Sequence, residues 1–149
     1  MRRFCGGCSF NAPAPGFRRF LFAPKVAAMI QLEGILTDRG SKYAVSGGPV
    51  QTRQEAAAFV KALCRNKKYT KATHNTWAVI LPDGTPVKND DGEAGAGMVI
   101  LRMLEREALV GEVVVVTRWF GGVKLGGDRF RRVQDCVRMY LEARNGKAG

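Results

Sequence analysis

The stretch VVVVTRWFGGVKLGGDRF at residues 113–130 constrains the fold of this chain more than any other segment. Residues 113–117 show no alternation of apolar and polar side chains, which predicts a strand buried on both faces in the middle of a sheet. Two glycine pairs follow, and glycine adopts the positive φ angles of sharp turns without strain. We expect Asp128 to be the N-cap of a helix that begins there. The stretch therefore predicts a central strand, a sharply turned loop and a helix.

The remaining patterns predict further strands and helices around that centre. Thr52 followed by Glu55 forms a capping box, which predicts a helix that ends near Asn66. Other apolar patterns predict strands over 30–36, 42–50, 72–81 and 86–89, and helices over 95–109 and from 128 onward. This order indicates the α+β class, with a single mixed sheet covered by helices over one face. We expect one domain over residues 30–149.

Residues 1–29 differ in composition from the rest of the chain. They carry the basic residues Arg2, Arg3, Arg18, Arg19 and Lys25 and no acidic residue, and prolines interrupt them. This composition is typical of a flexible basic tail or of an organelle transit peptide. An extension that packs its Phe and Leu side chains on the domain is a third interpretation. We expect a cytoplasmic protein, or an organellar one if residues 1–29 are a targeting segment.

The cysteines indicate a reducing compartment rather than a disulfide framework. Cys64 and Cys136 fall on apolar helical faces, where we expect core packing. Cys5 and Cys8 have CxxC spacing, but a redox motif requires a following helix and a zinc site requires a second pair. No apolar run approaches the roughly 18 residues that span a bilayer, so we expect no membrane partner.

Catalysis has little support among the polar residues. His74, the single histidine, lacks a nearby nucleophile, and its spacing from Asp91 and Glu93 matches no metal motif. We therefore interpret His74 as a structural hydrogen-bonding residue, with a polar site beside the acidic loop as the alternative. The carboxylates of residues 90–93 precede a helix and are expected to cap its free amides, with that polar site again the alternative.

The glycine loop does not match a nucleotide-binding motif. The P-loop pattern requires Lys and Ser or Thr after the glycines, whereas Asp128 follows Gly127 here, and an N-cap carboxylate would repel phosphate. We expect no cofactor and no metal. Trp119 and Phe120 beside Arg118 and Lys124 suit stacking on bases or anchoring of a protein, and we expect at least one of the two aromatics to pack beneath the loop.

Three polar and glycine-containing segments follow one another along the chain, namely ATHNTWA at 72–78, DDGEAGAG at 90–97 and TRWFGGVKLGGDRF at 117–130. In this order they resemble the signature of the IMPACT family, whose bacterial branch is the YigZ family. Asp128 and Arg129 resemble the eukaryotic branch, whereas Lys124 and Leu125 resemble the bacterial one. The resemblance implies a ribosomal-protein-like βαβ fold with a left-handed crossover. It also implies a non-enzymatic translational regulator in nutrient stress, which competes for the ribosome-associated co-activator of the kinase that phosphorylates initiation factor two.

Eukaryotic members of that family carry an additional RWD domain, which has no counterpart among these residues. A module that binds RNA or the ribosome is the alternative function, and an enzyme that uses His74 with the acidic loop is the weakest. We expect the signature segments to form one binding surface for a protein partner in translation control. Its predicted residues are His74, Asn75, Asp91, Glu93, Arg118, Trp119, Gly121, Gly122, Lys124, Gly126, Asp128 and Arg129.

Overall fold

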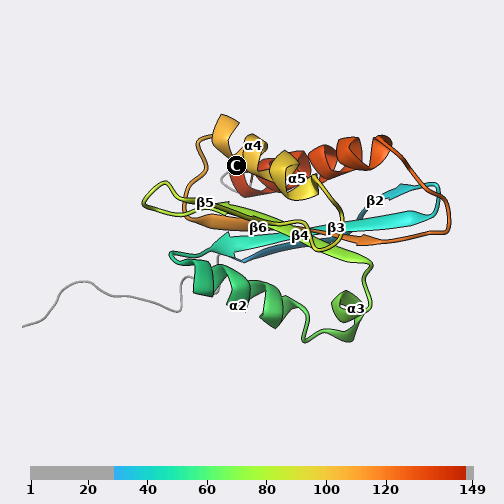
Figure 1. Ribbon diagram of the computed structural model, residues 1–149, viewed down its shortest axis with the longest axis horizontal. Coiled ribbons are helices and arrows are strands. Elements are labelled where there is room, and N and C mark those ends of the chain that lie inside the picture. The colour runs from blue at the N-terminus through green and yellow to red at the C-terminus, as the bar shows by residue number, and fades with distance from the viewer. Residues whose placement is uncertain (1–28, 147–149) are drawn as a thin grey trace, which may run out of the picture.

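A five-stranded sheet lies between two layers of helices in the computed structural model, which describes residues 29–146 (Figure 1). The strand order is β2-β3-β6-β4-β5. The bounds of the strands are Ile30–Asp38 for β2, Ser41–Pro49 for β3, His74–Ile80 for β4, Pro86–Asn89 for β5 and Glu112–Trp119 for β6. Every pairing within the sheet is antiparallel. The α+β class is confirmed, but the sheet is antiparallel rather than mixed.

Strand β6 occupies the centre of the sheet, as its uninterrupted valines predict. It pairs with β3 on one side and with β4 on the other. Val113, Val114 and Val115 are fully buried and Val116 nearly so. A strand with neighbours on both edges and helices on both faces has no side chain that faces solvent. Its side chains are therefore all apolar, and the sequence does not alternate between apolar and polar residues.

Helices cover both faces of the sheet, so the expectation of helices over one face is wrong. Helices α4 (Ala96–Arg106) and α5 (Asp128–Gly146) lie on one side, and α2 (Arg53–Leu63) and α3 (Lys67–Thr70) on the other (Figure 1). The reason is that successive residues of β6 point to opposite faces. Val114 and Val116 join the core beneath α4 and α5, whereas Val113 and Val115 join the core beneath α2 and α3.

The capping box of α2 forms, but one of its two hydrogen bonds is shifted by one residue. Thr52 Oγ1 accepts a hydrogen bond from Glu55 N at 3.0 Å, as predicted, but Glu55 Oε1 accepts from Gln51 N, at 2.7 Å, instead of from Thr52 N. Helix α3 was not predicted, because its four residues are too few to show a period. The sequence feature that could have predicted α3 is Asn66, the N-cap, whose side chain accepts a hydrogen bond from Lys68 N at 3.0 Å.

The topology brings the sequence motifs to one end of the sheet. Because β3 and β4 are both antiparallel to β6, they run parallel to each other on its two sides, and α2 and α3 lie between them in the chain. The starts of β3 and β4 therefore meet the end of β6. The loop that leaves β6 there leads directly into α5.

The two described cysteines, Cys64 and Cys136, are free thiols. Cys136 is fully buried in α5, and burial raises its pKa to about 12. Cys64 is half-buried at the C-cap of α2, where burial also raises its pKa. The predictions for Cys5 and Cys8 and for residues 1–28 lie outside the described residues. Among the residues that are described, no helix has the length and apolarity to cross a membrane.

Candidate functional site

The predicted site residues gather at the end of the sheet where β6 leaves it. His74 begins β4 and lies opposite Arg118, near the end of β6. The acidic loop over 90–95 connects β5 to α4 and contacts both strands, since Asp91 bonds to His74 and Glu93 to Arg118. The three signature segments, far apart in sequence, thus form one polar cluster.

A buried ion pair between Arg118 and Glu93 forms the base of this cluster. The side chain of Arg118 is 6% exposed and that of Glu93 is 5% exposed. Arg118 Nη1 donates to Glu93 Oε1 at 2.7 Å, and Nη2 donates to Ser41 Oγ at 3.4 Å. Arg118 Nε is buried without a hydrogen-bond partner. Separating the two side chains would leave each charge buried without a counter-charge, which is costly. We therefore expect the pair to hold one geometry.

His74 and Arg129 approach the same carboxylate. His74 Nε2 lies 3.8 Å from Glu93 Oε1, and Arg129 Nε lies 3.6 Å from it. His74 Nδ1 lies 2.9 Å from the carbonyl oxygen of Asp91, which can only accept, so Nδ1 carries a proton. Both ring nitrogens therefore face protein groups, in line with a structural hydrogen-bonding role.

Asn75 supports the cluster from within. It is 8% exposed, and its side-chain amide donates to Tyr69 O at 3.0 Å and accepts from Thr117 Oγ1 at 2.8 Å. Its backbone amide donates to Asp91 Oδ2 at 2.7 Å. Asn75 and Asp91 therefore fix the position of the acidic loop against β4, and Asn75 presents little surface to a ligand.

The three carboxylates of the acidic loop bind three different elements. Only Asp90 caps the following helix, because it accepts hydrogen bonds from Gly95 N at 3.0 Å and from Gly97 N at 2.7 Å. The hydrogen bond from Gly95 N and then that from Gly97 N lower the pKa of Asp90. The capping that was expected of the whole segment is therefore confirmed for Asp90, whereas Asp91 binds β4 and Glu93 binds β6.

Three of the four glycines in the loop after β6 are required, for two different reasons. A Cβ on Gly121 would lie 1.9 Å from the carbonyl carbon of Gly40, so two backbone segments touch there. Gly122 and Gly126 have φ angles of 96° and 59°, which favour glycine. Gly127 has neither feature, and a Cβ there would meet no atom within 4 Å.

Asp128 is the first residue of α5 and not its N-cap, which corrects the prediction. Its carboxylate accepts a hydrogen bond from Arg39 Nη2 at 2.6 Å, and that bond lowers the pKa of Asp128. Arg39 was not predicted to take part, because it lies 89 residues away, in the turn between β2 and β3, and no local pattern links it to Asp128. Near the start of α5, the amides of Asp128, Arg129 and Phe130 already donate to the carbonyls of residues 125–127, at 3.1–3.3 Å. This arrangement still disfavours a phosphate cradle, for a different reason from the one predicted.

The two aromatics of the loop behave as a pair, one packed and one exposed. Trp119 Nε1 donates to Lys68 O at 2.9 Å, and its ring lies 5.5 Å from that of Tyr69. Phe120 is 46% exposed, although its amide is fixed by a 2.8 Å bond to Thr73 Oγ1. Trp119 is therefore packed, as expected of at least one aromatic, but against α3 rather than beneath the loop.

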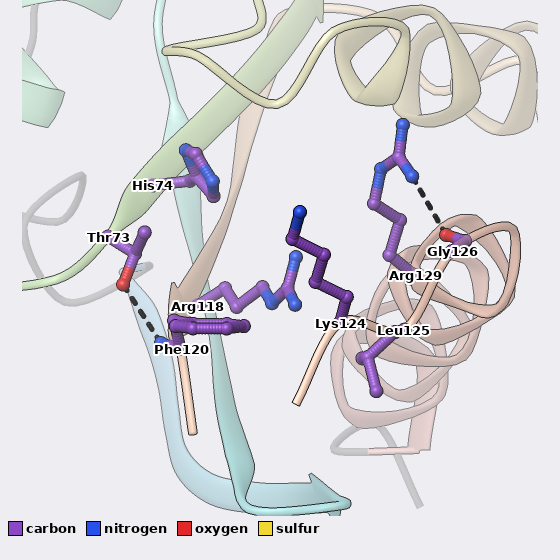
Figure 2. Close-up of a pocket in the computed structure, with 8 residues that line it drawn as sticks. All are labelled: Thr73, His74, Arg118, Phe120, Lys124, Leu125, Gly126 and Arg129. Atoms are coloured by element: carbon purple, nitrogen blue, oxygen red, sulfur yellow. Dashed lines mark hydrogen bonds between the residues drawn. The ribbon is translucent and has the colours of Figure 1, made fainter. Parts of the chain in front are cut away.

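A hollow of about 350 Å³ opens beside the ion pair (Figure 2). The side chains of His74, Arg118, Lys124 and Arg129 surround it, and no acidic residue is among those that line it. Lys124 makes no hydrogen bond or ion pair to the part of the chain that the structure describes. The residues that line the hollow are Thr73, His74, Arg118, Phe120, Lys124, Leu125, Gly126 and Arg129.

Phe120 also borders a second hollow, of about 580 Å³, on its other side. Lys42, Lys68 and Trp119 line that space with it. Within residues 29–146, no group of three or more His, Cys, Asp or Glu side chains is placed to hold a metal ion. The site offers cations, an exposed aromatic ring and a rigid base, and these are features of a binding surface.

An antiparallel sheet between two helical layers, with a polar glycine loop at one end, places residues 29–146 in the α+β class. The model of the Impact N-terminal domain matches residues 39–141. The chain belongs to the IMPACT family.

Sequence identity to IMPACT proteins from animals supports this membership. The chain is 34% identical over 118 residues to Protein IMPACT homolog of Caenorhabditis elegans, covering 74% of this chain and 46% of that protein. It is 35% identical over 115 residues to human Protein IMPACT, covering 74% of this chain and 36% of that one. The chain thus spans less than half the length of these relatives.

Two solved structures resemble the fold. The two-domain translational regulator Yih1 superimposes with a TM-score of 0.50 and 31% identity, over 76% of this chain and 46% of that one. A hypothetical protein superimposes with a TM-score of 0.69 and 23% identity, over 78% of this chain and 58% of that one, which supports the fold alone.

Proposed function

We propose that this chain regulates translation by binding a protein partner through the end of the sheet that carries the signature segments. We call this region the loop surface and define it by His74, Phe120, Val123, Lys124 and Arg129. The family supports the assignment, because Yih1 is described as a translational regulator. The proposed partner is the ribosome-associated co-activator of the kinase that phosphorylates initiation factor two, and the proposed effect is restraint of that kinase in nutrient stress.

The observation that carries the proposal is the exposure of Phe120 and Val123 on a fixed base. Their side chains are 46% and 48% exposed, and Lys124 follows Val123 directly. Beneath them, Arg118 and Glu93 are buried and joined at 2.7 Å. Protein interfaces concentrate their binding energy in a few apolar or aromatic anchors near cationic side chains, and a preorganised base reduces the entropic cost of binding.

Catalysis explains the same residues less well. Glu93 is engaged by Arg118, and both ring nitrogens of His74 face protein groups. Neither is available as a general base without first breaking these contacts. In addition, neither described cysteine is among the residues that line the hollow, so it lacks a thiol nucleophile.

Binding of RNA or the ribosome is the second candidate, favoured by the second hollow. Lys42, Lys68 and the two aromatics there alternate cationic and stacking groups, as surfaces for single-stranded nucleic acid do. Lys68, however, pairs with Glu33 at 3.3 Å, which weakens a continuous cationic path. RNA binding is distinguished by its salt dependence, because its affinity falls on a log-log line as phosphate contacts exchange with ions.

Capture of the named co-activator tests the proposal. Immobilised wild-type chain and the variants Val123→Ser, Phe120→Ser and Val110→Ser are incubated with native-cell extract, and the co-activator is quantified by immunoblot. Val110 is the matched control, because it is also 48% exposed but follows α4, away from the hollow. We expect Phe120→Ser to weaken capture about tenfold and Val123→Ser to weaken it measurably, with Val110→Ser equal to wild type. Unchanged capture by both loop variants, with melting temperatures preserved, would refute the proposal.

A further inference from the structure

The hollow beside the ion pair has an excess of positive charge that residues 29–146 do not neutralise. Within these residues, Glu93 is the one carboxylate paired with Arg118, and Arg129 and His74 approach the same oxygen atom. Lys124 adds a further cation and has no partner among residues 29–146. One carboxylate pairs with Arg118 and Arg129, and Lys124 leaves an unpaired positive charge at the concave space that these side chains line.

A buried donor without a partner gives an independent indication of a ligand. Arg118 is 6% exposed, it lines the hollow, and its Nε has no hydrogen-bond partner among residues 29–146. Buried donors are almost always satisfied, so an unsatisfied one beside an open space requires an explanation. Figure 2 shows the guanidinium of Arg118 reaching toward Lys124, with His74 and Arg129 around the same space.

We propose that this hollow binds a single anionic side-chain group of the protein partner, either a carboxylate or a phosphorylated hydroxyl. Lys124 and Arg129 are its direct contacts, and Arg118 supplies the cationic base. Arg129 is suited to the role because its side chain is 31% exposed and is oriented by a 2.8 Å bond from Nη1 to Gly126 O. This inference rests on the proposed function, since it names the chemistry that the loop surface recognises.

A peptide fits the surroundings of the hollow better than a polynucleotide does. Phe120 lines the hollow and Val123 directly precedes Lys124 in the same loop, and both are exposed, which suits an acidic side chain with apolar neighbours. Around the start of α5, Asp38 and Asp128 are exposed or half-buried carboxylates that pair with the neighbouring arginines Arg39, Arg131 and Arg132, so the surface there carries both charge signs. A run of phosphates would meet these carboxylates, whereas one anion within an apolar segment would not.

The test uses the full chain, labelled with ¹⁵N, and three tripeptide amides that differ only at the central residue. The central residue is aspartate, phosphoserine or asparagine, and leucine flanks it on both sides. Backbone amides of residues 120–129 and the Nε–H signals of Arg118 and Arg129 report binding. We expect saturable shifts with the aspartate peptide, the phosphoserine peptide or both, and affinity about tenfold lower for the asparagine peptide. Binding of only one anionic peptide identifies which source the site accepts.

Lys124→Gln and Lys61→Gln provide the matched pair of variants. Both remove one lysine charge, but Lys61 is an exposed residue of α2 on the opposite face of the sheet. We expect Lys124→Gln to weaken the anionic peptides about tenfold and Lys61→Gln to leave them unchanged. Equal affinity for the asparagine peptide, absence of saturation, or an unaffected Lys124→Gln variant would overturn the proposal. So would oligouridylate that binds these residues more tightly than either anionic peptide.

The experiments can refute the anion site and the proposed function independently of each other. If both loop-surface variants capture the co-activator normally while the anionic peptides saturate, the proposed partner is wrong and the anion site stands. If capture depends on Phe120 while no peptide saturates, the partner stands and the anion site is wrong. Lys124 makes no bond to a described residue, so Lys124→Gln is expected to fold normally, which a melting curve verifies.

Discussion

At the scale of single residues, Gly121 is fixed by its neighbour rather than by its own torsion angle. A Cβ there would lie 1.9 Å from Gly40 C and 2.4 Å from Ser41 N, both backbone atoms that cannot move aside cheaply. The contact holds the turn between β2 and β3 against the loop after β6. A sequence shows that a glycine is present, but it does not distinguish this close approach from a need for positive φ.

Gly121→Ala is therefore expected to destabilise the fold by about 2 to 3 kcal/mol, because backbone has to shift. Gly127→Ala is the matched control in the same loop, where a Cβ meets nothing within 4 Å. It is expected to change the free energy of unfolding by no more than about 0.5 kcal/mol. Urea unfolding of both variants measures the difference. Equal midpoints would contradict the close contact.

The Arg118–Glu93 pair leads to a second prediction at this scale. Glu93→Gln is expected to cost about 3 kcal/mol of unfolding free energy, because it leaves a buried guanidinium without its counter-charge. Glu93→Gln combined with Arg118→Gln should cost less than the two single changes added together. Arg138→Gln, which breaks only the more exposed pair with Asp135 at 2.8 Å, should cost less than about 1 kcal/mol. Strict additivity of the two buried changes would show that they do not interact.

At the scale of elements, the start of α4 depends on a residue outside the helix. Gly95 is the N-cap, has a φ of 91° and offers no side chain, so Asp90 supplies the acceptor for Gly95 N and Gly97 N. Capping by residues 90–93 was predictable from the position of the acids before an apolar helix. The assignment of that role to Asp90 alone was not, because it depends on how the loop turns back.

The lowered pKa of Asp90 makes this cap dependent on pH. The folded-state pKa lies below the ordinary value of 3.8, so the contribution is fully present above that value and is lost as the pH falls through the folded pKa. Asp90→Ala is expected to cost about 1 kcal/mol at pH 7. The difference from wild type should shrink as the pH falls below about 4. A constant difference from pH 7 to pH 3 would mean that the carboxylate charge is not what caps α4.

The elements themselves were largely predictable from the sequence. The strands, α2, α4 and α5 each lie within a few residues of the predicted ranges, because each shows apolar periodicity or a cap. Helix α3 was missed because it spans four residues. The pairing of Asp128 with Arg39 was also missed, since contacts between residues 89 apart leave no local pattern.

At the scale of the whole molecule, the two-sided sheet explains where the site lies. Residues Val113–Val116 supply both cores, so the polar groups are displaced to the ends of the strands. The order of three motifs indicated which segments form the candidate site, and the structure places these segments together at one end of the sheet. The sequence did not predict helices on both faces, because one central strand without alternation is compatible with several arrangements of covering helices.

The domain boundary at residue 30 is a prediction at this scale. Removal of residues 1–29 is expected to leave a sharp cooperative unfolding transition, because residues 30–146 contain both described cores. Thermal melting followed by circular dichroism compares the shortened and full chains. Loss of the sharp transition would show that residues 1–29 are part of the folded domain.

The most direct test of the central claim is the phosphorylation of initiation factor two under amino-acid limitation, measured in native cells that express the full chain. The account predicts that wild-type chain and Val110→Ser lower this phosphorylation equally, because both retain the loop surface. Phe120→Ser and Val123→Ser, expressed at the same level and folded, should lower it less. Restraint of the kinase by both loop variants as strong as that of the wild type would contradict the claim that this surface regulates translation.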